Sequence, residues 1–132
     1  MEDFQPISKE AILMGREVEF PLSALLTSNL EELLIRINKF AQEYYDYSRI
    51  NLIVNSGYRP GRYNIKAGGS ETSPHLYCQA VDLHDEDEKI KKFIAQELSI
   101  LDRCDLYLEH PSRTITWAHL DERSRINRIF IP

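Results

Sequence analysis

The chain has 132 residues, of which 42% are hydrophobic and 28% are charged, and its formal net charge at pH 7 is −5. A chain of this length buries enough apolar surface to fold without disulfides, so we expect a single domain over residues 1–132. The acidic balance argues against general binding of nucleic acid, which usually requires a clustered basic surface.

The first twenty residues contain acids and a proline, and they lack the apolar stretch after basic residues that marks a signal peptide. No segment is long and apolar enough to cross a membrane. We therefore expect a protein that is made in the cytoplasm without a signal peptide, does not insert into the membrane and is a monomer. The two cysteines, Cys78 and Cys104, are too few for a disulfide framework, and we expect both to be buried thiols.

Two segments have the apolar spacing of an amphipathic helix. In SNLEELLIRINKFAQEYYDY, residues 28–47, the apolar residues follow one helix face, and Ser28 or Asn29 is expected to cap the start. In DEDEKIKKFIAQELSIL, residues 85–101, acids precede lysines, which suits the helix dipole. We interpret the acids at 85–88 as a solvated helix start rather than a cation site.

Five short runs rich in β-branched or aromatic residues indicate strands. They are INLIVNSGY, QAVDLH, CDLYLE, TITWAHL and INRIFI, which begin at residues 50, 79, 104, 114 and 126. This order of elements predicts an α+β fold with a small antiparallel sheet and helices packed on it. Pro111 and Ser112 predict a hairpin between the third and fourth strands.

The segment SPHLYCQAVDL places His75 and Asp82 seven positions apart, beside a strand-like run. Imidazole and carboxylate groups suit zinc, and a catalytic zinc site has three protein ligands and one open position. His119, in a later strand, is the best candidate for the third ligand, and His84 and His110 compete for that place. By composition alone, a surface turn that leads into a half-buried strand is the favoured interpretation of this segment.

Three motifs occur in one order in SGYRPGRYNIKAGGSETSPHLYCQAVDLHD and the later WAHLD. They are Ser-Gly-Tyr-Arg, then Ser-x-His with an aspartate seven positions after the histidine, then Trp-x-His. In these motifs, over about residues 50–121, the chain resembles the zinc D-alanyl-D-alanine metallopeptidases. More loosely, the whole chain is similar to the small single-domain peptidases of bacteriophages and prophages. The resemblance implies an α+β fold shared with the hedgehog signalling domain, and zinc ligands His75, Asp82 and His119.

The resemblance also implies an activity, the hydrolysis of peptide bonds next to D-amino acids in the stem peptides of bacterial peptidoglycan. The enzyme would be a carboxypeptidase, or an endopeptidase such as a phage endolysin. It would act at the bacterial cell wall or periplasm, which a protein without a signal peptide reaches through a separate membrane-permeabilising protein. The alternative is a catalytically silent zinc-binding module that recognises a cell-wall peptide or a protein partner.

The Ser-Gly-Tyr-Arg motif assigns Arg59 to the site by the same resemblance. A guanidinium there would bind the scissile carbonyl oxygen or a substrate carboxylate through paired hydrogen bonds. Tyr58, Ser73 and Trp117 are expected to line the cleft and contact the substrate. For any single arginine, pairing with an acid of the fold is the default alternative.

Peptide hydrolysis requires a carboxylate that takes a proton from water and passes it to the leaving amine. One branch of the resembled family, the carboxypeptidases, has this acid three residues before the last histidine, where this chain has Thr116. Other branches place it on the preceding strand of the hairpin, with a tryptophan two positions before the histidine. Glu109 is therefore the favoured general base and acid, and Asp121 is the alternative.

The register of the hairpin decides whether Glu109 reaches the site. If Glu109 lay opposite Ile115, it would be about 13 Å from the level of His119, which is too far for a base. If it lay opposite Trp117, it would be diagonal to His119 at roughly 7 Å. We expect the second register, with a wide loop, although Glu109 could instead face solvent and pair with Arg113.

Overall fold

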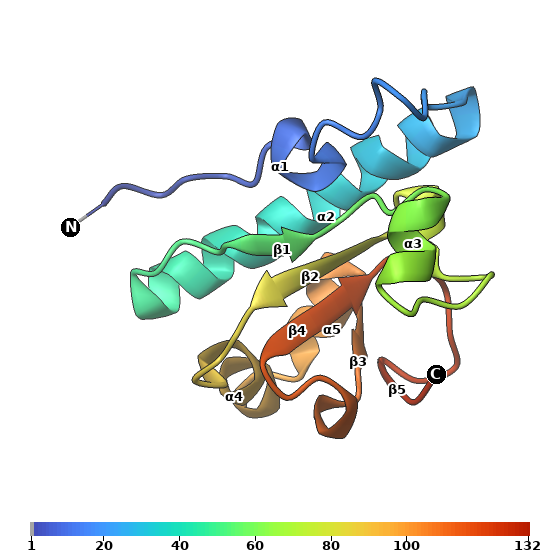
Figure 1. Cartoon of the computed structure of the whole chain (residues 1–132). Helices are drawn as coiled ribbons and strands as arrows, with labels where there is room; N and C mark the ends of the chain where they lie inside the picture. Colours follow the sequence, from blue (N-terminus) through green and yellow to red (C-terminus); the bar gives the residue numbers. More distant parts are fainter. Residues whose placement is uncertain (1) are drawn as a thin grey trace.

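A computed structural model describes residues 2–132, which form an α+β fold with one five-stranded sheet (Figure 1). The strands are β1 Val54–Ser56, β2 Ala80–His84, β3 Tyr107–Glu109, β4 Trp117–Asp121 and β5 Ile129–Phe130. The helices are α1 Lys9–Leu13, α2 Ala24–Ser48, α3 Arg62–Lys66, α4 Lys89–Gln96 and α5 Ser99–Cys104, with the 3-10 helices η1 Pro74–Tyr77 and η2 Pro111–Arg113. The predicted fold class is thus confirmed. None of the helices in residues 2–132 has the length and apolar character that a membrane span requires.

Helix α2 is the predicted first helix, but it begins earlier than its apolar pattern indicated. Its cap is Ser23, whose hydroxyl accepts a hydrogen bond from the amide of Leu26 at 3.2 Å. Leu26 packs against the core and extends the apolar stripe back by one turn, so Ser28 and Asn29 lie inside the helix. The predicted cap at these two residues is therefore wrong. The buried stripe comprises Leu30, Leu33, Ile37, Phe40, Ala41, Tyr44 and Tyr45.

The second predicted helix, residues 85–101, is divided into α4 and α5. The chain leaves the helical region at Glu97, where φ is −132°. Asp85 is buried, not solvated as predicted, because its carboxylate accepts hydrogen bonds from the amides of Ile90 and Lys91 at 2.8 and 3.2 Å. The acidic segment therefore does start a helix, as predicted, but Asp85 accepts these hydrogen bonds from the helix as a buried residue.

The ammonium group of Lys91 connects α4 to the segment between β3 and β4. It donates hydrogen bonds to the carbonyl oxygens of Thr114, Ile115 and Trp117 at 2.5, 3.1 and 2.9 Å. The carboxylate of Asp85 lies 3.5 Å away. A buried charge is tolerated only with such partners, so this contact holds the segment in one position.

The sheet has the strand order β1-β2-β4-β3-β5. Strand β2 pairs antiparallel with β1 and β4, and β4 pairs antiparallel with β3. Strand β5 instead pairs parallel with β3, at the edge of the sheet, so the prediction of an antiparallel sheet is wrong there. The amides of Leu108 and His110 donate to the carbonyl oxygens of Arg128 and Phe130 there, both at 2.7 Å. Arg128 adds ion pairs with Asp102 and Asp105, close to the start of β3.

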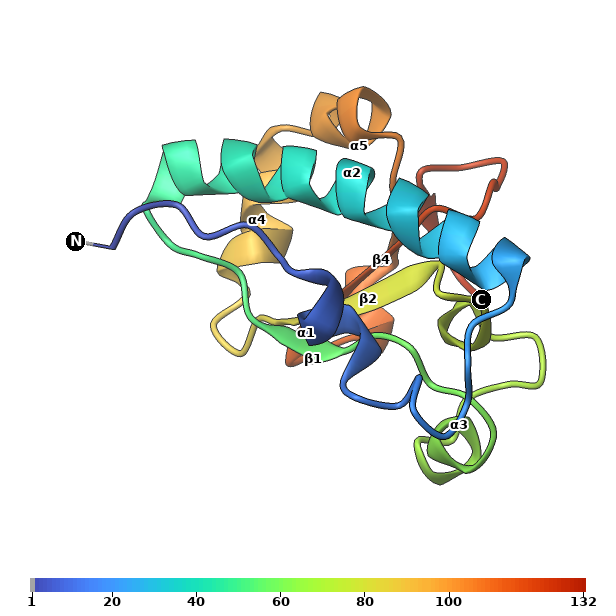
Figure 2. The same cartoon turned by 90° about the horizontal axis from the view of Figure 1, so that it is seen from above.

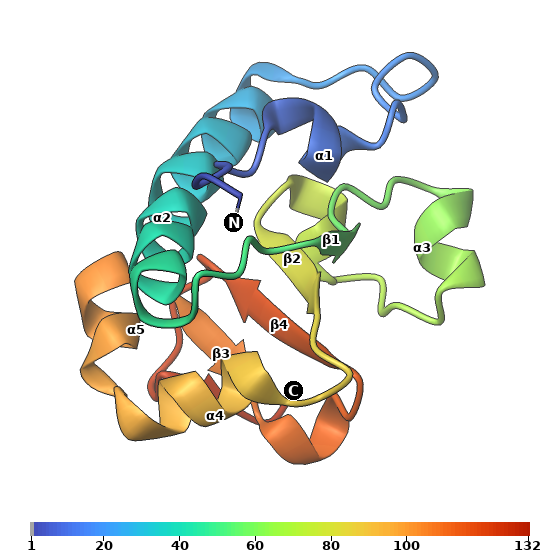
Figure 3. The same ribbon diagram turned by 90° about the vertical axis from the view of Figure 1, so that its left-hand side faces the viewer.

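The two faces of the sheet differ in polarity. Val81 and Leu83 of β2 and Leu120 of β4 belong to the hydrophobic core. Figures 2 and 3 show α2 and α5 on one side of the sheet and α3 on the other. Because side chains alternate along a strand, Asp82 and His119 lie on the face opposite to the core.

Candidate metal centre

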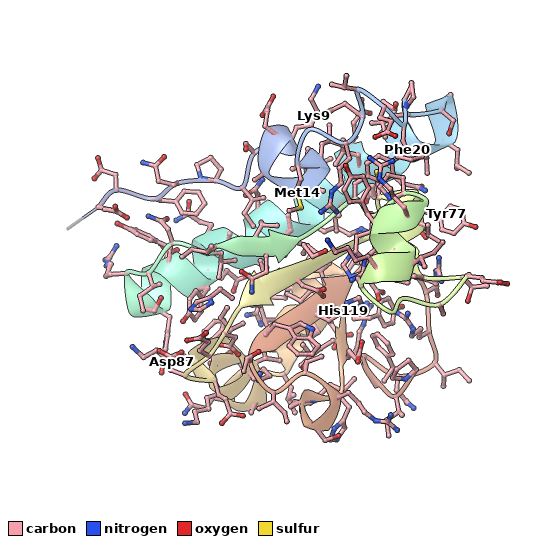
Figure 4. All side chains as sticks on the ribbon, viewed as in Figure 1. Lys9, Met14, Phe20, Tyr77, Asp87 and His119 are labelled. Atoms are coloured by element: carbon pink, nitrogen blue, oxygen red, sulfur yellow. The ribbon has the colours of Figure 1, made fainter. Side chains whose placement is uncertain are left out.

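The side chains of His75, Asp82 and His119 lie together on the polar face of the sheet. Asp82 and His119 are directly opposite each other on β2 and β4, and His75 comes from η1. One possible ligand atom from each residue lies within 4.8 Å of the others. Within residues 2–132 this is the only group of three or more such side chains with this spacing. Figure 4 shows His119 in the middle of the molecule, near the segment that carries α3.

His75 is held in place by its own backbone turn and by a glycine. The hydroxyl of Ser73 accepts a hydrogen bond from the His75 amide at 3.2 Å, which starts η1. The imidazole Nδ1 donates to the carbonyl oxygen of Gly57 at 2.8 Å, leaving Nε2 facing Asp82 at 3.2 Å. Only glycine fits at position 57, because an added Cβ would lie 2.3 Å from the carbonyl oxygen of Ile12.

His119 is oriented by a second carboxylate. Its Nε2 lies 2.7 Å from Oδ2 of Asp121, and its Nδ1 lies 2.9 Å from Oδ1 of Asp82. Asp121 is fully buried, and its other oxygen accepts hydrogen bonds from the amide of Arg123 and the guanidinium of Arg125. Both oxygens of Asp121 are therefore engaged, and Nδ1 is the His119 atom that faces the site.

The ionisation of the cluster reflects these contacts. Burial alone would raise the pKa of Asp82, but hydrogen bonds with His119 and His75 lower it well below its usual range. Burial would lower the pKa of His119, but hydrogen bonds with Asp121 and Asp82 raise it to about 9. Both shifts favour the charged forms, because the carboxylates and the imidazole of His119 stabilise each other across short hydrogen bonds. The grouped carboxylates also favour a bound cation at this place.

The arrangement fits zinc. Two imidazole nitrogens and one carboxylate are a common ligand set for a catalytic zinc ion with an open position. The second nitrogen of each imidazole is occupied, by the Gly57 carbonyl or the Asp121 carboxylate, as is usual for metal-binding histidines. The residues present therefore match a zinc site both in their three ligand atoms and in the hydrogen bonds that orient the two imidazoles.

A cavity of about 320 Å³ opens at the three side chains. Four residues that the sequence analysis singled out line it together with them: Arg59, Ser73, Glu109 and Trp117. Tyr58 differs from its predicted position, because it is buried and its hydroxyl donates to the carbonyl oxygen of Phe20 at 3.0 Å. It belongs to the core beneath the cleft, where it supports the backbone next to Arg59.

The sequence analysis did not identify two other residues that line this cavity, Arg125 and Phe130. The guanidinium of Arg125 lies 3.5 Å from the centre of the Phe130 ring. Both follow the last motif of the resemblance. Arg125 is held there by its ion pair with Asp121, and Phe130 reaches the cleft because β5 pairs with β3. No local pattern in the sequence indicates the strand pairing that places Phe130.

The other two histidines lie elsewhere. His84 is exposed at the end of β2, and it lines a different cavity, beside α4. His84 lies on the same face of the strand as Asp82, but two residues further along, which places it more than about 6 Å from Asp82 and outside the cluster. His110 is exposed, and its Nδ1 forms a hydrogen bond with Ser112 at 2.8 Å.

Glu109 lies closer to the site than either expected register would place it. Tyr107 pairs with Asp121 and Leu108 with Leu120, so the same register brings Glu109 opposite His119. The predicted pairing with Trp117 is therefore wrong. Opposite residues of an antiparallel pair have Cβ atoms about 4.5–5.5 Å apart, on one face.

The surroundings of Glu109 affect its charge. Burial raises the pKa of Glu109, and the neighbouring His119 partly opposes this shift. The alternative partner, Arg113, is exposed on η2, and the ion pairs found in residues 2–132 do not include one between it and Glu109. Glu109 is thus a half-buried carboxylate at the metal cluster, as a general base requires.

The geometry can be compared with known families. A family model described as Peptidase M15 matches residues 21–121. The match begins before α2 and ends with β4, so it contains His75, Asp82, Glu109 and His119. No curated protein matches the chain.

Proposed function

Because the chain belongs to the peptidase M15 family, whose members are zinc-dependent, we propose that it hydrolyses peptide bonds next to D-amino acids in peptidoglycan stem peptides. One observation carries this proposal: a single cavity contains the metal cluster, a carboxylate and a guanidinium. These are the groups that peptide hydrolysis requires. The catalytically silent module considered above would not need Glu109 in that cavity.

The ligands of the zinc ion would be Nε2 of His75, an oxygen of Asp82 and Nδ1 of His119. When bound, zinc supplies a Lewis acid that polarises the scissile carbonyl and makes water a stronger acid. Asp121 orients His119 through Nε2, and the Gly57 carbonyl orients His75. These hydrogen bonds keep Nε2 of His75 and Nδ1 of His119 pointing toward the metal position.

Glu109 is the general base and acid of the proposal. Its position opposite His119 allows it to take a proton from the attacking water and then deliver that proton to the leaving amine. The raised pKa of Glu109 favours the second step, because a stronger tendency to hold the proton makes its acid form available at a higher pH.

Arg59 is placed to bind an oxygen of the substrate. Its Nη2 lies 3.5 Å from the hydroxyl of Ser73, and its Nη1 lies 4.0 Å from the carboxylate of Asp82. Both contacts are long, so the guanidinium retains donors for a peptide carbonyl or carboxylate. Ser73 and Trp117 form walls of the same cavity.

The direct test is digestion of purified peptidoglycan by the zinc-loaded protein, with and without a chelator. Fragments identified by mass should appear only without the chelator. Release of single D-amino acids would show a carboxypeptidase, and release of larger peptides or loss of cross-links would show an endopeptidase. If the zinc-loaded protein binds peptidoglycan but releases nothing, the silent binding module is the correct interpretation.

Replacement of Arg59 by lysine should reduce activity about tenfold or more. Lysine keeps the positive charge but loses the planar fork that binds one oxygen-bearing group through two hydrogen bonds. The loss of one charge-assisted hydrogen bond corresponds to a change of this order. The rate is measured on a soluble stem peptide, and metal analysis and thermal unfolding should match the parent protein. An unchanged rate would return Arg59 to a structural role.

A further inference from the structure

A second cavity, of about 570 Å³, lies beside the cleft and shares Arg59 and Ala67 with it. Its lining contains four cations, Arg16, Arg59, Arg62 and Lys66, together with Ser56, Tyr63 and Ala67. No carboxylate of residues 2–132 is part of that lining. This basic groove is unlike the rest of a chain whose net charge is −5.

The basic groove is built from two segments far apart in the sequence. Arg16 follows α1, and its guanidinium lies 4.2 Å from the ring centre of Tyr63 in α3 and donates to the carbonyl of Tyr58 at 2.7 Å. Arg62 lies 4.8 Å from the same ring and forms an ion pair with Glu19. Figure 3 shows the chain after α1 approaching α3 on one side of the molecule. The tyrosine ring is therefore flanked by two guanidinium groups that both reach the groove.

Most of this positive charge is not neutralised by the protein. Lys66 and Arg16 form no ion pair with any residue that the structure describes, and Arg59 has only its 4.0 Å contact with Asp82. Four of the arginines elsewhere pair closely with acids: Arg36, Arg103, Arg125 and Arg128. Grouped like charges cost free energy, which a bound anion offsets.

We propose that the basic groove binds a carboxylate of the substrate peptide and makes the enzyme prefer peptides that carry this negative charge. The inference rests on the proposed function, because the groove meets the metal centre at Arg59. A peptide whose scissile bond lies at the cluster reaches the groove by passing the guanidinium of Arg59. Arg16 and Lys66 then bind a group that Arg59 alone does not hold.

The test compares peptides that differ in one group. Each pair of stem peptides is identical except that a side-chain carboxylate on one member is an amide on the other, and separate pairs place this group on either side of the scissile bond. The parent protein should prefer the carboxylate in one of these positions by about fivefold or more in kcat/KM. Lys66→Glu should abolish or invert this preference.

Lys92→Glu is the matched control, because Lys92 is exposed on α4, away from the groove, and the substitution changes the net charge equally. This variant should keep the preference of the parent protein. Equal losses in the two variants would mean that the preference reflects total charge, and the proposal would be overturned. A parent protein that cleaves both members of every pair equally well would overturn it as well.

Binding measurements separate this proposal from the proposed activity. If the zinc-loaded protein cleaves none of the peptides, the proposed function fails. Calorimetric titration of the same pairs then tests the groove alone, which should bind the carboxylate form more tightly and lose that difference with Lys66→Glu. Tight binding of inorganic phosphate without any difference between the peptides would assign the groove to phosphate and overturn the proposal.

Discussion

Glu109→Gln should bind zinc like the parent protein and hydrolyse stem peptides at least about a hundredfold more slowly. A single general acid-base group contributes about a hundredfold to ten-thousandfold in rate. Glutamine keeps the size of the side chain but cannot take a proton from water near neutral pH, so the rate of the chemical step should decrease. The measurement is kcat on a soluble stem peptide at saturating substrate, with zinc content determined on the same samples.

The pH profile gives an independent signature of the same group. As a base, Glu109 must be ionised, so kcat/KM should fall as the pH drops through its pKa. Burial raises that pKa above the usual value of 4.5, so the fall should occur at a higher pH than for an ordinary glutamate. The residual activity of Glu109→Gln should not show this acid limb.

Two controls limit the interpretation of this variant. Its melting temperature should be close to that of the parent protein, because a half-buried strand residue seldom changes stability greatly. Asp121→Asn should weaken zinc binding about ten- to hundredfold, as the loss of a group that orients a ligand does, and excess zinc should restore much of its activity. If Glu109→Gln retains near-normal turnover while Asp121→Asn is inactive even with excess zinc, Asp121 is the base.

His119→Ala should lose most of the bound metal. The parent protein is expected to hold about one equivalent of zinc through His75, Asp82 and His119, and the alanine variant keeps only two ligands. Metal analysis after removal of free zinc measures the effect. His110→Ala is the matched control, because it removes an exposed histidine outside the cluster and should retain the full metal content. Full retention by His119→Ala would disprove the ligand assignment.

Thermal unfolding provides a second readout of the same site. A metal that binds the folded protein stabilises it according to its concentration and affinity. A chelator should therefore lower the melting temperature of the parent protein and of His110→Ala, and it should have little effect on His119→Ala. An equal decrease in all three proteins would mean that the chelator acts elsewhere.

The elements that local chemistry determines were predictable from the sequence. The apolar stripe of α2 predicted a core helix, and the segment with His75 and Asp82 predicted a turn that leads into a strand. Both patterns depend on residues close together in the chain. The metal site itself, and His119 as its third candidate ligand, came from the motifs of the resemblance, because the distance of His119 from the other two residues in the sequence gives no geometric information.

What the sequence did not reveal depends on contacts between distant residues. The register of Glu109 depends on how the segment between β3 and β4 is placed, and Lys91 of α4 holds that segment by hydrogen bonds. The sequence around Lys91 does not show that this lysine is buried while the neighbouring lysines are exposed. The parallel pairing of β5 goes with the ion pairs of Arg128. In the same way, the groove cations come from two segments that meet only in the folded protein.

The route of the last strand has a practical consequence for protein engineering. Phe130 and Pro132 line the cleft, so any polypeptide joined after Pro132 starts at its wall, beside the proposed substrate site. The opposite end of the chain runs past the last turn of α2, where Phe4 packs against Tyr45, and Figure 1 shows the two termini well separated. A purification tag or a fused binding domain therefore belongs at the amino terminus, because a carboxy-terminal fusion would compete with the substrate and imitate a loss of activity.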